Sequence, residues 1–586
     1  MKLTKYIFSA AIILSGALLT SCNNWLEEKP ESFIGPESIG DSEAAASRWV
    51  AGVYSNWLDD MFRWSNFPRV LELDADYISG PDWLFGNLGA GNFQGDDTCN
   101  SLWSGCYNLI NDANTAIRYV SAMSSISDAV KNNALGELYF QKAFAYFLLV
   151  RAYGAIPYFE SDVASGVEYY QPRMAVADVY GKITDLLTQA AGMMYKNTDS
   201  GFNTGHVSAG SAAGLLAKVY ATMASGAMSA DTEIQIRTGK PFTGTTYKDA
   251  EGNETFKEFR SPTPETFKKT VVAGHESMNA QELYEKAAEW AKKVIDGEYG
   301  SYELSSYDNL WKKSNRDASE FMWAVRSNNG DQVYCTHIHT YYSGYKTSAS
   351  SEFIESGGWV GCTNNWYELF DSQDYRIAKG VRHTWRYYYQ ESYDGCFYYP
   401  LSWKVRITGS DLTNTYVQEP DPEYAATGYN YQYNQSSECL AFTTKYNDVE
   451  DEATDYADSQ WPFLRYADVL LIYAEAENEL GNSTEAMTYL NQVRQRSNAT
   501  LMTTYQGKMK MRSAILEERA KEFACEGDRR WDLIRWGVYL DAMNAIGGRD
   551  EANIVKTRET RHLLYPIPTV EMNVNKAITE NNPGWN

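Results

Sequence analysis

The sequence predicts a mainly α-helical protein with a tetratricopeptide-like scaffold of helical hairpins and long irregular loops rich in aromatic residues. Two observations support this prediction. Eight segments have the apolar spacing or composition of helices. Two long stretches without this periodicity hold many aromatic residues among Gly, Asn and Asp. Amphipathic helices joined by short connections are typical of stacked hairpins, although no strict repeat consensus is present.

The N-terminus has the pattern of a bacterial lipoprotein signal. Two lysines precede an apolar stretch from Ile7 to Leu19, which is too short to span a membrane stably. The stretch ends in LTSC, which is similar to a lipobox, where a lipid is attached to the cysteine and the chain is cut before it. We therefore expect residues 1–21 to be removed and Cys22 to carry a lipid anchor. The alternative is an ordinary secretory signal followed by an incidental cysteine.

The eight predicted helices follow one another along the chain with two long interruptions. The segment 135–152 is apolar on nearly every side, so we expect it to be buried between neighbouring helices. It stops before Gly154 and Pro157, as a helix end should. The predicted helices are 102–120, 135–152, 179–194, 212–223, 284–295, 464–480, 485–496 and 511–523.

We expect residues 22–586 to form a single domain in which two irregular excursions interrupt the helical scaffold. The excursions span about 57–103 and 327–459. The scaffold is expected in the ranges of about 40–60, 101–226, 281–326 and 460–586.

Both excursions are rich in aromatic residues, with nine between Trp57 and Trp103 alone. Long loops lie on the surface, so we expect some of these rings to be exposed. Exposed rings beside Asn, Asp and Gln suit a carbohydrate, because sugars present apolar C–H faces and hydroxyl groups. The alternative is that the rings only pack the loops onto the scaffold.

The composition argues against two classes of function. The chain has 586 residues and a net charge of −24, whereas nucleic-acid phosphates require a basic surface. Its eight cysteines and six histidines include no pair with zinc spacing, so we expect no metal centre and no cofactor. No EF-hand loop is present, and a structural calcium ion on scattered Asp and carbonyl oxygens stays an open alternative.

One residue from each excursion is the main candidate for a ligand site. In the first, Gly80 and Pro81 predict a turn that projects Asp82 and Trp83 outward. We expect the Trp83 ring to stack on a sugar while Asp82 and Asn87 bind its hydroxyl groups. In the second, the candidate rings are Trp359, which follows two glycines, and Tyr341 and Tyr342.

Acidic and basic side chains alternate between Glu517 and Arg535. A catalytic interpretation would make two of these carboxylates an acid and a base. Each carboxylate, however, has an Arg or Lys within four residues, which favours structural pairing and lowers a carboxylate pKa. We therefore expect this charged cluster to be structural, and Trp531 and Trp536 within it to be core residues.

Several motifs resemble those of the SusD/RagB family of Bacteroidetes outer-membrane lipoproteins. The strongest lie in the C-terminal third, and the lipobox followed by WLEEKPES also fits. The matching segments are WPFLRYADVLLIYAEAENELG (461–481), ILEERAKEFACEGDRRWDLIRWG (515–537), the ending from Leu563 to Trp585, and GELYFQKAFAYFLLVRAYGAIPYF (136–159). Residues 227–280 and 327–459 match weakly.

This resemblance implies a SusD-like fold of four tetratricopeptide-like units whose variable loops carry the ligand site. It also implies a non-enzymatic lipoprotein on the outer-membrane surface, which captures glycans for a SusC-like TonB-dependent transporter. The first alternative is a SusD-like protein that captures peptides or glycopeptides. More distant alternatives are a surface glycoside hydrolase and a tetratricopeptide-type adaptor.

Overall fold

A computed structural model describes most of the chain after residue 37. The described ranges are 38–62, 66–240, 262–329, 334–344, 358–385, 395–399, 440–454 and 456–585, with short strands between them. The predicted signal and Cys22 lie outside these ranges. None of the described helices is both long and apolar enough to cross a membrane.

All eight predicted helices are present, and most begin a few residues earlier than predicted. The apolar pattern starts at the first buried residue, whereas polar caps such as Asp96, Ser127 and Ser208 set the true helix starts. With the N-terminal α2, they are α2 (Glu43–Asn56), α5 (Asp97–Ala122), α6 (Asp128–Tyr153), α7 (Val176–Met193), α8 (Ala209–Ala227), α9 (Ala280–Ile295), α14 (Tyr466–Leu480), α15 (Ser483–Arg496) and α16 (Lys508–Glu522).

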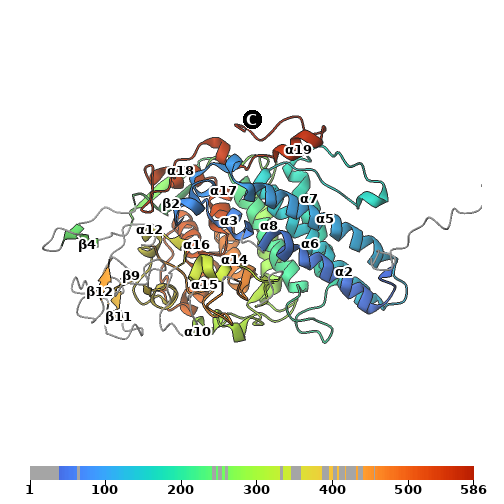
Figure 1. Ribbon diagram of the computed structural model, residues 1–586, viewed down its shortest axis with the longest axis horizontal. Helices are drawn as coiled ribbons and strands as arrows, with labels where there is room; N and C mark the ends of the chain where they lie inside the picture. Colours follow the sequence, from blue (N-terminus) through green and yellow to red (C-terminus); the bar gives the residue numbers. More distant parts are fainter. Residues whose placement is uncertain are drawn as a thin grey trace, which may run out of the picture.

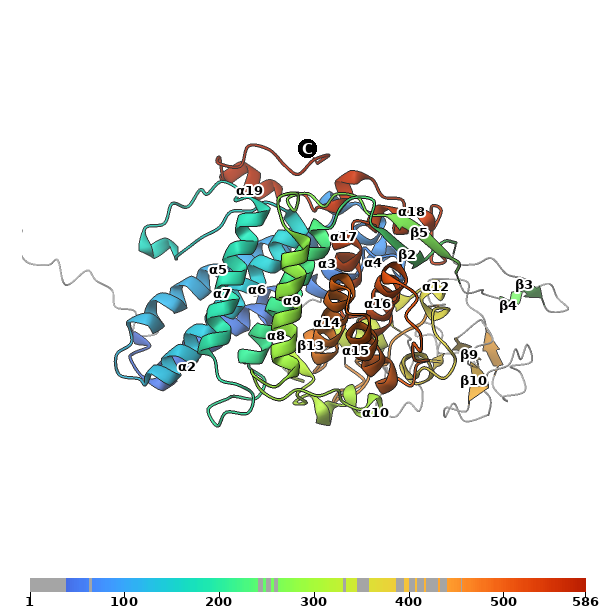
Figure 2. The same ribbon diagram turned by 180° about the vertical axis from the view of Figure 1, so that it is seen from behind.

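The helices form a stack in which consecutive members are neighbours (Figures 1 and 2). Helix α5 packs on α6, α6 on α7, α7 on α8 and α8 on α9. Helix α6 is buried along most of its length, as its apolar composition predicts. The mainly α-helical hairpin scaffold is therefore confirmed.

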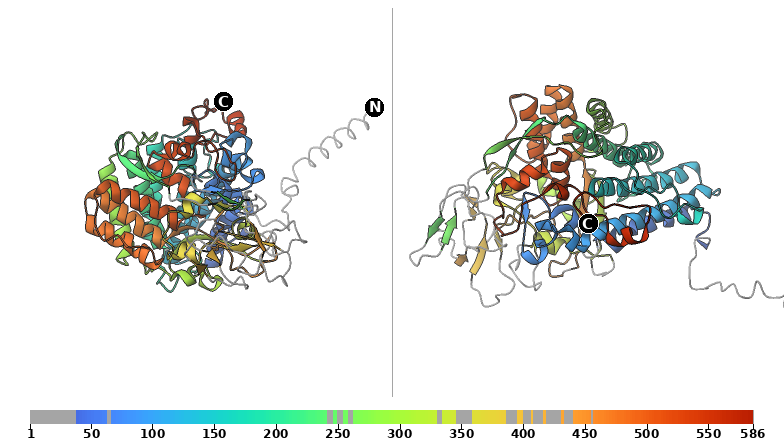
Figure 3. Two further views of the ribbon diagram at one scale, coloured as in Figure 1. Left: turned by 90° about the vertical axis from the view of Figure 1, so that its left-hand side faces the viewer. Right: turned by 90° about the horizontal axis from the view of Figure 1, so that it is seen from above.

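The stack continues across a long gap in the sequence. Helix α14 packs on α9, although the two are separated by the whole second excursion. At the base of that excursion, strand β6 (Phe321–Arg326) pairs antiparallel with β13 (Gln460–Arg465). This ladder holds the two ends of the intervening chain together, so the scaffold is continuous in space (Figure 3).

The remaining elements are shorter. Strands β2 (Glu233–Arg237) and β5 (Pro264–Lys268) pair beside α17 (Arg529–Arg535) and α18 (Tyr539–Ala545), over a small core that includes Ile234 and Trp536. The others are α3 (Asn66–Glu72), α4 (Asp82–Phe85), α10 (Tyr307–Leu310), α11 (Ile338–Ser343), α12 (Asn364–Tyr367), α13 (Tyr375–Ala378), η8 (Thr560–Leu563), α19 (Thr569–Val574), β1 (Ile78–Ser79), β3 (Thr246–Lys248), β4 (Glu254–Lys257), β7 (Gly361–Cys362), β8 (Thr384–Trp385), β9 (Gly395–Tyr398), β10 (Arg406–Ile407), β11 (Tyr416–Val417) and β12 (Asn430–Gln432).

The charged cluster is structural, as predicted, but most of its partners are distant in sequence. Local pairs occur, such as Lys521 with Glu517 at 2.8 Å. Most of the others join separate elements, because these side chains are buried where several helices meet. Examples are Glu518–Arg376, Asp532–Arg519, Arg535–Glu475, Arg529–Asp76 and Glu526–Arg465.

Pairing in the charged cluster shifts carboxyl pKa values in the direction opposite to that of a general acid. The Lys521 and Arg237 side chains lower the pKa of Glu517 to about 2, despite the opposing effect of burial. Arg496, Arg465 and Arg376 hold the pKa of Glu522 far below its ordinary value, against a large burial penalty. Trp531 and Trp536 are buried core residues, as predicted.

Helix α6 also carries a half-buried ion pair that depends on pH. The Glu137 carboxylate accepts a hydrogen bond from Tyr54 and lies 2.7 Å from Nδ1 of His206. The hydrogen bond to Glu137 raises the pKa of His206 above its ordinary value of 6.5.

We expect His206→Gln to lower the free energy of unfolding by about 1 kcal/mol or less, and mainly at acidic pH. Since the folded-state pKa of His206 is raised, its stabilising effect is complete below the unfolded pKa of about 6.5 and disappears as pH rises through the folded value. Urea unfolding of both proteins across this pH range measures the difference. A difference that grows with increasing pH would contradict the assignment.

Candidate functional site

Most aromatic residues of the first excursion pack onto the scaffold. Trp64 lies outside the described residues. Trp83 is the exception among the others, with 62% of its surface exposed. The buried rings are those of Trp57, Phe62, Phe67, Tyr77, Phe85, Phe93 and Trp103. The packing alternative therefore holds for these seven rings, and one ring is left for a ligand.

A short helix presents Trp83 to solvent. The carbonyl of Pro81 accepts hydrogen bonds from the N–H groups of Leu84 and Phe85 and so closes the single turn of α4. Leu84 and Phe85 are buried and anchor this turn, whereas Asp82 and Trp83 are exposed. The sequence predicted that a turn projects Asp82 and Trp83 outward. In the structure these two residues begin a short helix, and both are exposed as predicted.

A two-residue ladder joins the tips of the two excursions. Strand β1 pairs antiparallel with β7, with Ile78 opposite Cys362 and Ser79 opposite Gly361. Gly80 follows β1, and a Cβ atom there would lie 2.2 Å from the backbone oxygen of Trp359. Only glycine permits this close approach, which brings the loop carrying Trp83 against the segment carrying Trp359.

Three of the predicted rings form one cluster, which we call the aromatic cluster: Trp83, Trp359 and Tyr341. The Trp359 ring lies between the others. Its centroid is 5.1 Å from that of Trp83 and 5.3 Å from that of Tyr341, with interplanar angles of 82° and 83°. Edge-to-face contacts at these distances are favourable. Since Trp83 remains largely exposed, the cluster has an open aromatic surface.

The backbone fixes Trp359 beside helix α11. The carbonyl of Tyr341 accepts hydrogen bonds from the N–H groups of Trp359 and Val360, at 2.7 and 2.8 Å. Gly358 has a φ of +106°, and a Cβ atom there would lie 2.9 Å from the backbone of Tyr342. Trp359 and Tyr341 are both half-buried, so they support Trp83 and contribute part of the exposed surface.

The prediction that Tyr342 contributes to the ligand site is wrong. It is 1% exposed and packs on Tyr446 and Trp461, with ring centroids 5.5 Å away in both cases. Adjacent residues of helix α11 point to different sides, so Tyr341 faces the cluster while Tyr342 enters the core. Tyr342 cannot stack on a ligand, and we remove it from the candidate site.

Two exposed polar residues flank Trp83 in the sequence. Asp82 and Asn87 are both exposed, on either side of the buried anchors of α4. The Asn87 side-chain oxygen accepts a hydrogen bond from Asn92 at 3.3 Å, which leaves its amide N–H₂ group for other partners. A flat apolar face beside a carboxylate and an amide has the chemistry that a polyhydroxylated ring requires.

A second exposed aromatic pair was not predicted. Tyr169 and Tyr170 lie between α6 and α7, with exposures of 58% and 45% and ring centroids 5.3 Å apart. Two adjacent tyrosines in a glycine-containing segment without helical periodicity were the available signal. Among the described residues, no group of three or more His, Cys, Asp or Glu side chains is placed to hold a metal ion.

Two family models match the chain, one in its N-terminal part and one in its C-terminal part. The family model described as "SusD family" matches residues 355–585, and another described as "starch-binding associating with outer membrane" matches residues 24–221. The chain is 23% identical to SusD-like protein P25 of Formosa agariphila, over 99% of this chain and 98% of that protein.

Solved structures share the fold. A SusD homolog from Bacteroides thetaiotaomicron superposes with a TM-score of 0.68 at 21% identity, covering 93% of this chain and 97% of that chain. Surface glycan-binding protein A from Bacteroides fluxus gives a TM-score of 0.61 at 19% identity, covering 93% and 100%. At these identities the likeness concerns the fold alone.

Proposed function

Because the chain belongs to the SusD family, we propose that it is a non-catalytic, cell-surface lipoprotein that captures glycans and delivers them to a TonB-dependent outer-membrane transporter. The observation that carries the proposal is the aromatic cluster, in which Trp83 is exposed and supported by Trp359 and Tyr341. In this role Cys22 carries the lipid anchor, and a SusC-like transporter is the partner.

The expected affinity is modest. If each stacked sugar contributes roughly 1–2 kcal/mol, by analogy with aromatic pairs, two or three stacks with hydrogen bonds give about 4–6 kcal/mol. This range corresponds to dissociation constants from about tens of micromolar to about 1 mM. Weak binding suits a protein that must release its ligand inward, and tethering beside a transporter raises the effective concentration of the ligand.

We expect Trp83→Ala to weaken glycan binding about tenfold, because removing one stacking face removes about 1–1.5 kcal/mol. The measurement is retention of wild-type and variant proteins on an array or affinity gel of polysaccharides. Tyr169→Ala is the matched control, since Tyr169 has a similar exposure but lies outside the aromatic cluster. Equal retention by wild type and Trp83→Ala would remove the cluster from the ligand site.

The same panel separates the alternatives. Peptides and glycopeptides included beside the polysaccharides test the peptide-capture alternative, which predicts retention on those ligands instead. A glycoside hydrolase would release shorter products on incubation with a glycan. Such an enzyme needs two carboxyl groups roughly 5–10 Å apart in a cleft. Among the described residues, burial raises the pKa of two carboxyls, those of Glu72 and Glu551, to about 8, and neither residue is part of the aromatic cluster.

A further inference from the structure

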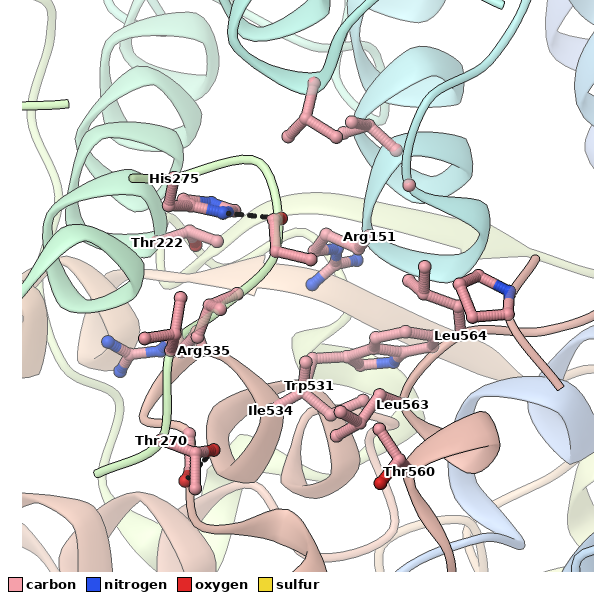
Figure 4. A pocket seen from close by; sticks show the side chains of 18 of the residues that line it. Arg151, Thr222, Thr270, His275, Trp531, Ile534, Arg535, Thr560, Leu563 and Leu564 are labelled. Carbon is pink, nitrogen blue, oxygen red and sulfur yellow. Dashed lines mark hydrogen bonds between the residues drawn. The ribbon is translucent and has the colours of Figure 1, made fainter. Parts of the chain in front are cut away.

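A second site lies where the C-terminal segment crosses the helical stack (Figure 4). It is a cavity of about 250 Å³ that shares no residue with the aromatic cluster. Its walls come from the end of α6, from α7 and α8, from the connection 270–275 between β5 and α9, and from α17 and η8. Most of the lining is apolar, with side chains such as Val150, Val176, Trp531, Ile534, Leu563 and Leu564.

One charged side chain in this lining lacks a counterion. The Arg151 guanidinium lies 4.1 Å from the ring centroid of Phe147. It lies 5.2 Å from the ring centroid of Trp531, and Figure 4 shows both of these side chains in the lining. Its Nε is buried without a hydrogen-bond partner. Within the described part of the chain, no carboxylate forms an ion pair with Arg151.

The carboxylates that act on Arg151 electrostatically form ion pairs with other cations. Burial lowers the pKa of Arg151, and this effect exceeds the opposing effect of the Asp528, Asp532 and Asp468 carboxylates, which raise it. Their carboxylates bind other cations, at 2.9 Å for Asp528 with Lys218 and 2.8 Å for Asp532 with Arg519. Arg535, which also lines the cavity, is bound to Glu475 and Asp532. Arg561, the third arginine of the lining, pairs with Glu559 at 3.2 Å. Arg151 is therefore the arginine of this lining that has no ion pair among the described residues.

One further cation is adjacent to the lining in sequence. Lys269, which precedes the lining residue Thr270, is 2% exposed and donates hydrogen bonds only to the carbonyls of Gly226 and Thr270 among the described residues, at 3.0 and 3.1 Å. His275 adds no positive charge, because its Nδ1 donates to the carbonyl of Ala273 and burial lowers its pKa, which leaves Nε2 as an acceptor. The charge that favours an anion is therefore that of Arg151, with Lys269 nearby in the chain.

The chemistry of the lining selects the ligand class. A guanidinium is planar and stays protonated, so it matches the two oxygens of a carboxylate. A neutral sugar would leave several hydroxyl groups without partners against apolar walls, which is unfavourable. Inorganic phosphate has no apolar part to fill the cavity. We propose that this cavity binds a small monocarboxylate with an apolar body, its carboxylate on Arg151 and its hydrocarbon part against Trp531 and Ile534.

The cavity size restricts the ligand further. Its volume of about 250 Å³ is slightly below the range of about 300–1,000 Å³ found for most small-molecule sites. Octanoate and 3-phenylpropionate are therefore suitable probes, one with an alkyl body and one with an aryl body. Octanamide has the same alkyl body as octanoate without the charge.

Calorimetric titration of the full mature chain with these three compounds tests the proposal. We expect at least one of the two carboxylates to bind. Octanamide should bind at least about tenfold more weakly than octanoate. Arg151→Met should weaken carboxylate binding about tenfold and leave octanamide binding within about twofold. Arg561→Met is the matched control, because Arg561 lines the same cavity but already pairs with Glu559; its effect should stay within about twofold.

A second variant tests the cavity independently of the charge. Val272 is half-buried in the connection that covers the cavity, and Val272→Trp should block it and abolish binding of all the probes. Thermal unfolding establishes that each variant is folded, and glycan retention should be unchanged because the aromatic cluster is separate. The proposal is overturned if folded wild type binds neither carboxylate at millimolar concentration, or if Arg151→Met binds octanoate as wild type does.

Discussion

Replacing Arg465 with methionine is expected to lower the free energy of unfolding by about 3–5 kcal/mol. Arg465 is 1% exposed, and its guanidinium donates hydrogen bonds to the carboxylates of Glu320, Glu522 and Glu526 at 2.8–2.9 Å. Removing this cation leaves three buried carboxylates with too few counterions, because among the described residues only Arg496, Arg376 and Lys445 remain beside them. A buried charge left without its partner lowers the free energy of unfolding far more than the loss of one surface ion pair does.

Equilibrium unfolding in urea measures this effect for wild type and variant. Lys313→Met is the control, since the Lys313 side chain is 38% exposed and pairs with Glu450 at the surface. We expect less than about 1 kcal/mol for that change. Similar losses in both variants would show that the buried network around Arg465 contributes no more than a surface pair.

The second large effect concerns the contacts that hold the first excursion on the scaffold. Asp74 is fully buried and accepts hydrogen bonds from Arg530, Arg558 and Tyr539. We expect Asp74→Asn to lower the free energy of unfolding by about 3–5 kcal/mol, because two buried arginines lose their counterion while the side-chain volume is kept. Denaturant unfolding again provides the measurement.

Asp74→Asn should also affect ligand binding. Asp74 lies between Glu72, which accepts hydrogen bonds from Cys525 and Gly527, and Asp76, which binds Arg529. These contacts fix the chain just before β1, which positions Trp83. We expect reduced glycan retention in Asp74→Asn and unchanged retention in Asp308→Asn, an exposed control whose carboxylate pairs with Lys379. Full retention and full stability in Asp74→Asn would contradict both expectations.

The charged cluster shows how far local reasoning extends. Alternating signs between Glu517 and Arg535 predicted pairing, and the ion pairs confirm that these side chains pair. The spacing, however, suggested partners within four residues. A buried carboxylate takes whichever cation lies beside it in the folded core, so Glu518 binds Arg376 and Asp532 binds Arg519.

The candidate site was predictable by region but not by residue. The excess of aromatic residues in the excursions indicated exposed rings, and Trp83 is exposed. Neighbouring tyrosines of one short helix, however, have opposite environments: Tyr341 joins the aromatic cluster and Tyr342 enters the core. No local pattern distinguishes them, because their burial depends on which distant segments pack against each side of α11.

Local sequence was sufficient to predict the helices, since apolar periodicity, polar caps and glycine stops act within a few residues of chain. It also determined the acidic balance and indicated the lipid-anchor signal, which are properties of composition and of one short segment. Two features follow only from the packing of distant segments: Trp83 contacts Trp359, and Arg151 has no counterion among the residues that the structure describes. Both outcomes depend on contacts between segments far apart in the chain, whose free energies are set by packing of the whole fold.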